Sequence, residues 1–132
     1  MKHLLIKTLA GSGLMLLALT ARAQYQPRTE YEGRHEAREH AWLFDRARTD
    51  LDRAESFTVP FTGDRDRVVR ARREVNECQR DVATGEDDRQ TFGEAIAAIQ
   101  RVVDLNHLPD RNRALLADDI NALRDLQARL EG

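Results

Sequence analysis

The feature that most constrains the fold is a strongly apolar stretch, TFGEAIAAIQRVVDLNHL, which runs from residue 91 to residue 108. Its large apolar side chains recur at steps of four, three and four, the spacing that places them on one face of an α-helix; they are Phe92, Ile96, Ile99 and Val103. Thr91 and Glu94 have the capping-box spacing that satisfies free amides at a helix start. A face this apolar requires other helices to cover it.

Three further segments carry apolar stripes with helical spacing. The stripes are Ala37, His40, Phe44, Ala47, Leu51 and Ala54; Val68, Ala71, Val75, Cys78 and Val82; and Leu116, Ile120, Leu123 and Leu130. Together with the stretch above they predict helices at about 34–56, 65–83, 91–106 and 110–130. We expect Asp64 to cap the second helix and Gly85 to end it in a left-handed conformation. Asp118 and Asp119 lie early in the fourth helix, where its dipole favours acidic side chains.

The composition and the short connections specify the fold class. A chain with 41% apolar, 33% charged and only 5% aromatic residues fits a helical protein better than a β-sandwich. Short connections favour antiparallel neighbours, so we predict an all-α, up-down-up-down four-helix bundle over residues 34–132, a single domain. The alternative is a three-helix core with a loosely docked first helix. Phe57 and Phe61, in the first connection, are expected to fold back and cover the end of the bundle.

The first 23 residues have the pattern of a cleaved export signal. Lys2 and Lys7 precede an uncharged apolar run, and Ala21-Arg22-Ala23 offers the small-x-small sequence that signal peptidase recognises. The run is too short for a permanent membrane anchor. We therefore expect a mature chain that begins near Gln24, is periplasmic or extracellular, and has a flexible tail at 24–33.

Charge and cysteine content restrict the partners. Removing Lys2, Lys7 and Arg22 leaves 18 basic and 23 acidic side chains, a net charge of about −5, which gives no general attraction to nucleic acid. The one cysteine, Cys78, lies on an apolar stripe and is expected to be buried. The alternatives are a disulfide between two chains or a thiol ligand.

Three further patterns carry candidate sites. A row on the first helix has the residue types of interface anchors and predicts a contact surface for a protein partner or a second copy; it comprises Tyr31, His35, Arg38, Trp42 and Arg46. The alternatives are that the bundle wraps this end of the helix and that Arg38 and Arg46 simply stack on the indole. Pairs spaced four apart, His35 with Glu39 and Glu36 with His40, allow a metal site, although di-iron bundles need such motifs on two helices.

The third pattern is a basic run on the second helix, Arg65, Arg67, Arg70, Arg72 and Arg73. We interpret it as a solvated face, with binding to anionic envelope polymers or lipid headgroups as the alternative. No nucleophile motif, phosphate loop or haem-attachment motif occurs, so neither an enzyme nor a cofactor is expected. The sequence therefore favours a non-enzymatic protein-interaction module; the alternatives are a metal- or stress-linked periplasmic accessory protein and an envelope structural protein.

The size, the export signal and the arginine-rich helices resemble the small periplasmic helical stress chaperones of the Spy and CpxP type. Those proteins carry a repeated Leu-Thr-x-x-Gln motif. At the comparable helix start this chain reads Leu108-Pro109-Asp110-Arg111-Asn112, without the Thr or the Gln, and only once. No site residues are carried over; the resemblance implies only that an exported bundle of this size can serve as a binding protein.

Overall fold

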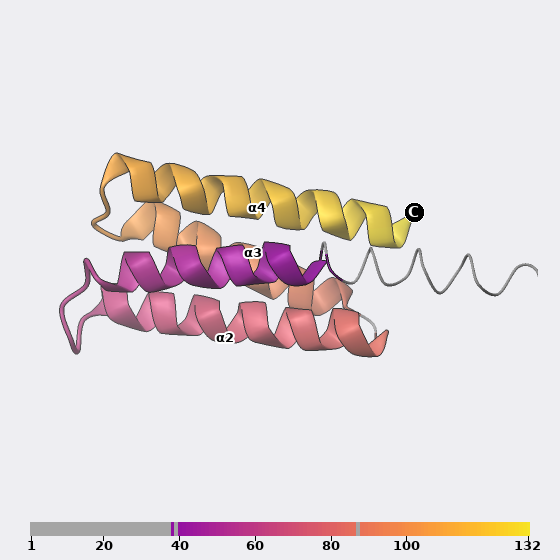
Figure 1. The fold of residues 1–132 in the computed structure, drawn as a ribbon. Helices are drawn as coiled ribbons and strands as arrows, with labels where there is room; N and C mark the ends of the chain where they lie inside the picture. Colours follow the sequence, from indigo (N-terminus) through magenta and orange to yellow (C-terminus); the bar gives the residue numbers. More distant parts are fainter. Residues whose placement is uncertain (1–37, 39, 87) are drawn as a thin grey trace, which may run out of the picture. The chain divides into compact units, whose positions relative to one another are not determined.

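The described part of the chain, in a computed structural model, comprises residues 38, 40–86 and 88–132, and it is helical between short connections (Figure 1). A first helix, described over residues 40–55, is followed by α2 (Gly63–Thr84), α3 (Arg89–Leu105) and α4 (Asp110–Glu131). No strand occurs among the described residues. The predicted signal segment and the tail at 24–33 lie outside them.

The four helices form the predicted antiparallel bundle. The first helix bonds to α2 through Arg48, which donates to Asn76, and to α4 through Arg46, which donates to Asp119. In turn, α3 packs against both α2 and α4. Each helix therefore neighbours the next along the chain, and the fourth returns to the first. Figure 1 shows the first helix and α2 side by side, joined by a loop at one end of the bundle.

The core is built mainly from the predicted stripes. Every helix contributes fully buried side chains, and the largest are Phe44, Leu51, Phe92, Ile99, Leu116, Leu123 and Leu126. Each such side chain contributes roughly 1.5–3 kcal/mol when it leaves water. Because Phe44, Ala47, Leu51 and Ala54 of the first helix are all completely buried, this helix is an integral part of the core. The alternative of a loosely docked first helix is therefore wrong. So is the prediction for Leu130, which is exposed near the end of α4.

The helix ends differ from the predicted caps. The α2 helix begins at Gly63 with Thr62 as its N-cap, so Asp64 lies inside the first turn instead of capping it. The α3 helix begins at Arg89, which places Thr91 inside the helix, where its hydroxyl donates to the Asp88 carbonyl; the predicted capping box does not form. Gly85 does end α2 in the left-handed conformation, with φ 71°.

Asp64 joins the start of α2 to the connection between α3 and α4. Its carboxylate accepts hydrogen bonds from the His107 amide at 3.1 Å and from Arg67 at 2.5 Å, and its carbonyl accepts one from the buried Asn106 side chain at 2.9 Å. The His107 amide hydrogen bond, followed by the His107 ring and the Arg67 charge, holds the pKa of Asp64 below its ordinary value. These bonds fix the two connections at the same end of the bundle.

The loop at residues 56–62 does not cover the end of the bundle. Phe57 is 49% exposed and Phe61 is fully exposed, so the prediction that these rings fold back is wrong. Leu108, from the connection between α3 and α4, packs against the core. It lies beside His107 and Asn106, which bond to the start of α2, so an apolar side chain already contacts the core at this end.

Candidate functional site

An exposed tryptophan on the first helix is held beside an arginine. Trp42 is 62% exposed, and the guanidinium carbon of Arg46 lies 5.1 Å from the centre of its ring. This distance is within the range of a cation–π contact, which is worth about 0.5–1 kcal/mol at an exposed site. The sequence placed both residues on the predicted contact row. The stacking of an arginine on the indole is present, and it leaves most of the ring open to solvent.

Arg46 is also bonded to the interior of the bundle. Its Nε atom donates to Oδ1 of Asp119 on α4 at 2.7 Å, and Asp119 is completely buried. Asp50, one helical turn beyond Arg46, is only 5% exposed and its carboxyl group meets that of Asp119. Arg53 approaches Asp50 from the solvent side at 3.4 Å. A buried pair of carboxyl groups thus lies between the first helix and α4, beneath Arg46 and Trp42.

A shared proton allows the two buried carboxyl groups to lie close together. Two ionised carboxylates are both acceptors and repel each other, whereas a protonated one donates to its neighbour. Among the described residues Oδ2 of Asp119 is buried without a hydrogen-bond partner, and protonation of the Asp119 carboxyl group lowers the cost of burying it beside Asp50. Burial, with the neighbouring Asp50, raises the pKa of Asp119 to about 7, although Arg46 opposes the shift.

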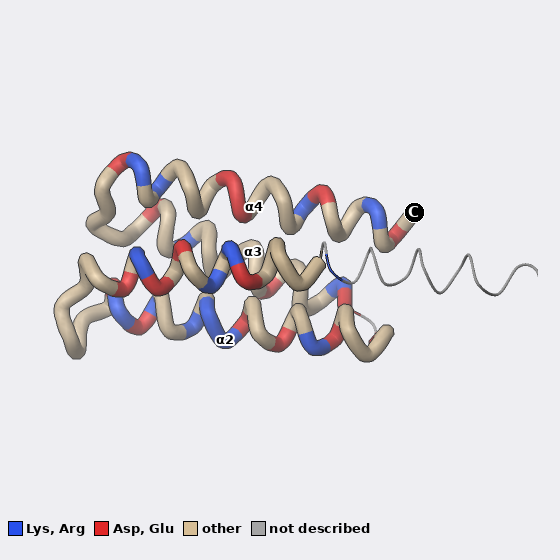
Figure 2. The backbone as a smooth tube through the Cα atoms, in the orientation of Figure 1, with Lys and Arg blue, Asp and Glu red and all other residues tan. Residues whose placement is uncertain are grey.

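Arginines of the basic run connect α2 to the first helix instead of forming only a solvated face. Arg72 bonds to Glu55 and to Asp52, the latter at 2.9 Å, and Arg65 lies 3.2 Å from Glu55. The hydrogen bond from Arg72 is the main reason why the pKa of Glu55 is lowered, with the charges of Arg72 and Arg65 adding to it. Figure 2 shows basic and acidic residues interspersed along the helices, with no large region of a single sign.

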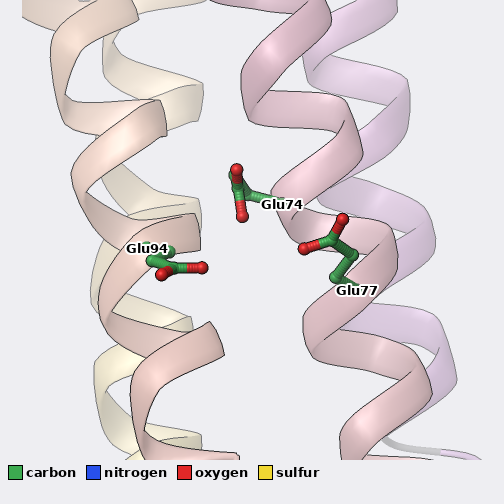
Figure 3. Close-up of side chains that lie close together, drawn as sticks. All are labelled: Glu74, Glu77 and Glu94. Carbon is green, nitrogen blue, oxygen red and sulfur yellow. The ribbon is translucent and has the colours of Figure 1, made fainter.

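Three glutamates gather on the other side of α2. The carboxylates of Glu74 and Glu77 on α2 and Glu94 on α3 point toward one another (Figure 3), and one oxygen from each lies within 4.8 Å of the others. Burial raises the pKa of Glu74, and the charges of Glu77 and Glu94 add to this effect. Arg73, at 3.7 Å from Glu74, offsets it in part. Hard cations such as Ca²⁺ prefer six or more oxygen ligands, which is more than three glutamates supply singly. Protonation of Glu74 also relieves the repulsion among the three carboxylates. The cluster alone is therefore not evidence for a metal site.

Tyr31, His35, Glu36 and Glu39 lie outside the described residues, so three of the four members of the predicted metal pairs have no described position. His40 is half-buried in the first helix and Arg38 is exposed. Cys78 is completely buried, as its stripe predicted, and burial raises the pKa of its thiol to about 12.

Sequence reasoning missed the carboxyl pair. The sequence pattern of Asp119 was interpreted only through the helix dipole, whereas the structure buries this residue completely. The signal was present: Asp119 is three residues after Leu116 and four before Leu123, so it belongs to the apolar face of α4. Asp50 lies in the same way between Ala47 and Ala54 on the first helix. An acidic residue at such a position on two neighbouring helices indicates a buried pair.

Comparison of the chain with protein-family models, with curated proteins and with solved structures found no match. Among the described helices, none combines the length and the apolar character needed to cross a lipid bilayer.

Proposed function

We propose that this protein is an exported, non-enzymatic binding module that contacts a protein partner, or a second copy of itself, through the surface formed by Arg38, Trp42 and Arg46. The observation that carries the proposal is the exposed Trp42 ring, which is held in place from below. Tryptophan and arginine dominate the energetics of protein interfaces because each combines a large contact area with directional hydrogen bonds. A side chain that is already ordered loses less entropy when it binds.

The buried carboxyl pair beneath Trp42 lowers the stability of the bundle. A buried carboxyl pair destabilises the fold, and apolar residues at positions 50 and 119 would pack the interior better. The pair instead holds the Nε of Arg46 at 2.7 Å from Asp119, which orders the guanidinium beside the indole. If the surface around Trp42 binds a partner, this explains why Asp119 is retained in the interior, where it holds Arg46.

The burial of the carboxyl pair supports the proposal that the protein is not an enzyme. Asp119 has the raised pKa that a general acid requires. It is, however, completely buried, and the groove between α2 and α3 is lined by neither Asp50 nor Asp119. A carboxyl group that substrate cannot reach does not act on it. The export of the chain is supported by the composition of residues 1–23, and N-terminal sequencing of the protein from its host tests it by locating the mature start near Gln24.

Site-specific photo-crosslinking tests the contact surface. A photoreactive residue replaces Arg38 in one version of the protein and the exposed Arg80 of α2 in a control, each expressed in the native host. We expect a discrete adduct, with a partner or with a second copy, from position 38 only. Trp42→Ala should weaken the association by about 2 kcal/mol or more, the size of an interface hot spot. Equal adducts from both positions, or an adduct at 38 that survives Trp42→Ala unchanged, would rule out this surface.

A further inference from the structure

The loop at residues 56–62 presents apolar side chains to solvent at one end of the bundle. Phe57 is 49%, Val59 65% and Phe61 fully exposed, and Pro60 between them is exposed as well. Figure 1 shows this loop projecting beyond the ends of the two helices that it joins. Single exposed apolar residues are ordinary on protein surfaces, whereas several at one projecting tip indicate a contact site.

The backbone of the loop holds Phe61 outward. Phe61 has a φ of 64°, a left-handed conformation that is uncommon for a bulky residue. The hydroxyl of Thr58 donates to the Glu55 carbonyl at 2.7 Å, and that of Thr62 donates to the Val59 carbonyl at 2.6 Å. These bonds order the turns on both sides of Pro60. The exposure of the rings is therefore a property of an ordered loop.

Behind the tip, a groove of about 390 Å³ lies between the start of α2 and the end of α3. Its lining contains Arg67, Arg70 and Arg101, with Asp66 as its acidic member. Arg67 is bonded to Asp64. Arg70 and Arg101 are exposed, and neither makes a hydrogen bond or an ion pair with any residue that the structure describes.

We propose that this end of the bundle docks on an anionic phospholipid bilayer, with Phe57, Val59 and Phe61 entering the boundary between headgroups and acyl chains and with Arg70 and Arg101 binding lipid phosphates. The dimensions agree with this arrangement. Arg70 is seven residues beyond Gly63, about 10 Å along α2 at 1.5 Å per residue, and interfacial segments enter the bilayer to about 5–10 Å.

A bilayer suits this surface better than a folded protein does. Lipids rearrange around a projecting tip, whereas a protein would need a hollow of matching shape. The two guanidinium groups without partners complement anionic headgroups, and their long side chains reach toward the phosphate level from the helix surface. The tip follows the C-terminal end of the first helix, whereas Trp42 lies near the start of its described part, so the two surfaces are separate. This inference does not depend on the proposed function.

Vesicle flotation tests the proposal with the protein purified from its host. The wild type should bind equimolar phosphatidylglycerol–phosphatidylethanolamine vesicles more tightly than pure phosphatidylcholine vesicles. Phe57→Ser with Phe61→Ser should lower the partition coefficient at least about tenfold, since the two rings supply most of the inserted apolar area. Arg70→Gln with Arg101→Gln should lower it on anionic vesicles alone, by about fivefold per arginine.

Matched controls change the same residue types elsewhere. Leu130→Ser exchanges an exposed apolar residue near the end of α4, and Arg124→Gln with Arg129→Gln removes two exposed charges from the same helix. Both controls should bind as the wild type does. Failure of the wild type to float with anionic vesicles would overturn the proposal, as would equal losses in test and control variants. So would a photoreactive residue at position 61 that forms adducts with protein and none with lipid in the native host.

Discussion

Replacing Asp119 by asparagine should change how the stability of the bundle depends on pH. The carboxyl group of Asp119 ionises near 3.8 in the unfolded chain, whereas burial and the neighbouring Asp50 raise its pKa to about 7 in the folded protein. Between these values the folded state holds a proton that the unfolded state has released. The free energy of unfolding therefore falls as pH rises from about 4 to about 7, and it loses nothing more from this group above pH 7.

The magnitude follows from the width of that interval. About three pH units at about 1.4 kcal/mol per unit amount to about 4 kcal/mol of stability lost at pH 8 relative to pH 4. Asparagine in place of Asp119 carries no charge at any of these pH values. Its side-chain oxygen can still accept from Arg46 and its amide can donate to Asp50, which supplies the missing hydrogen without a titrating proton. The variant should match the wild type at pH 5 to within about 1 kcal/mol and exceed it by about 3 kcal/mol at pH 8, because about two pH units separate pH 5 from the folded-state pKa of about 7.

Urea unfolding followed by circular dichroism at several pH values between 5 and 9 measures this difference. Urea is preferred to guanidinium because it does not screen charges. Asp118→Asn is the matched control, since it removes the same formal charge from the adjacent, exposed position. The single tryptophan, Trp42, provides an independent fluorescence signal from the surface above the pair. If Asp119→Asn and Asp118→Asn gave the same stability–pH curve, the buried, shared proton would not exist.

Three further predictions concern the core and the glutamate cluster. Ile99→Ala should lower the free energy of unfolding by about 2–5 kcal/mol, because it leaves a cavity at a completely buried position, and a thermal melt shifted no more than by Ala97→Gly would contradict this placement. Cys78 should resist thiol reagents at pH 8 in the folded protein and react in urea, because burial raises its pKa to about 12; equal rates in both conditions would show an accessible thiol. Glu74→Gln should stabilise the bundle at pH 7 by about 0.5 kcal/mol, since it removes repulsion from Glu77 and Glu94, and this gain should shrink as pH falls toward the raised pKa of Glu74. The difference is measured by urea unfolding, and a loss of stability would refute the repulsion.

The fold could be predicted from the sequence because the burial of apolar side chains, which contributes most to its stability, follows a helical period. Phe44, Val75, Ile99 and Leu123 each belong to a stripe with a spacing of three and four, and burial of such stripes leaves one economical arrangement. Local details such as helix caps, which contribute less to stability, could not be predicted. Asp64 has the right residue type for an N-cap, but its carboxylate bonds to His107, forty-three residues away, and no local pattern predicts that contact.

The exposed loop and the buried aspartate beneath Trp42 were the hardest features to predict. Phe57 and Phe61 are exposed because the loop turns are ordered by Thr58 and Thr62 and because Leu108, from another connection, packs against the core. Aromatic residues are usually buried, so residue type alone gave the opposite answer. Asp119 was missed for a related reason: an aspartate in a helix is usually solvated, and only its position between Leu116 and Leu123 indicates burial.

The buried carboxyl pair and the exposed tryptophan make separable contributions, and one variant distinguishes them. Asp50→Ala combined with Asp119→Leu replaces the pair by apolar side chains of similar total volume. Such replacements are often neutral or stabilising by about 1–4 kcal/mol, because two desolvated polar groups are removed together. The guanidinium of Arg46 then loses its 2.7 Å hydrogen bond, and nothing fixes it beside Trp42. We expect a bundle that unfolds at the same or higher urea concentration and yet forms less of the adduct captured from position 38. If adduct formation were unchanged in this variant, the network beneath Trp42 would serve no purpose in binding; if stability collapsed, the pair would be needed for folding itself.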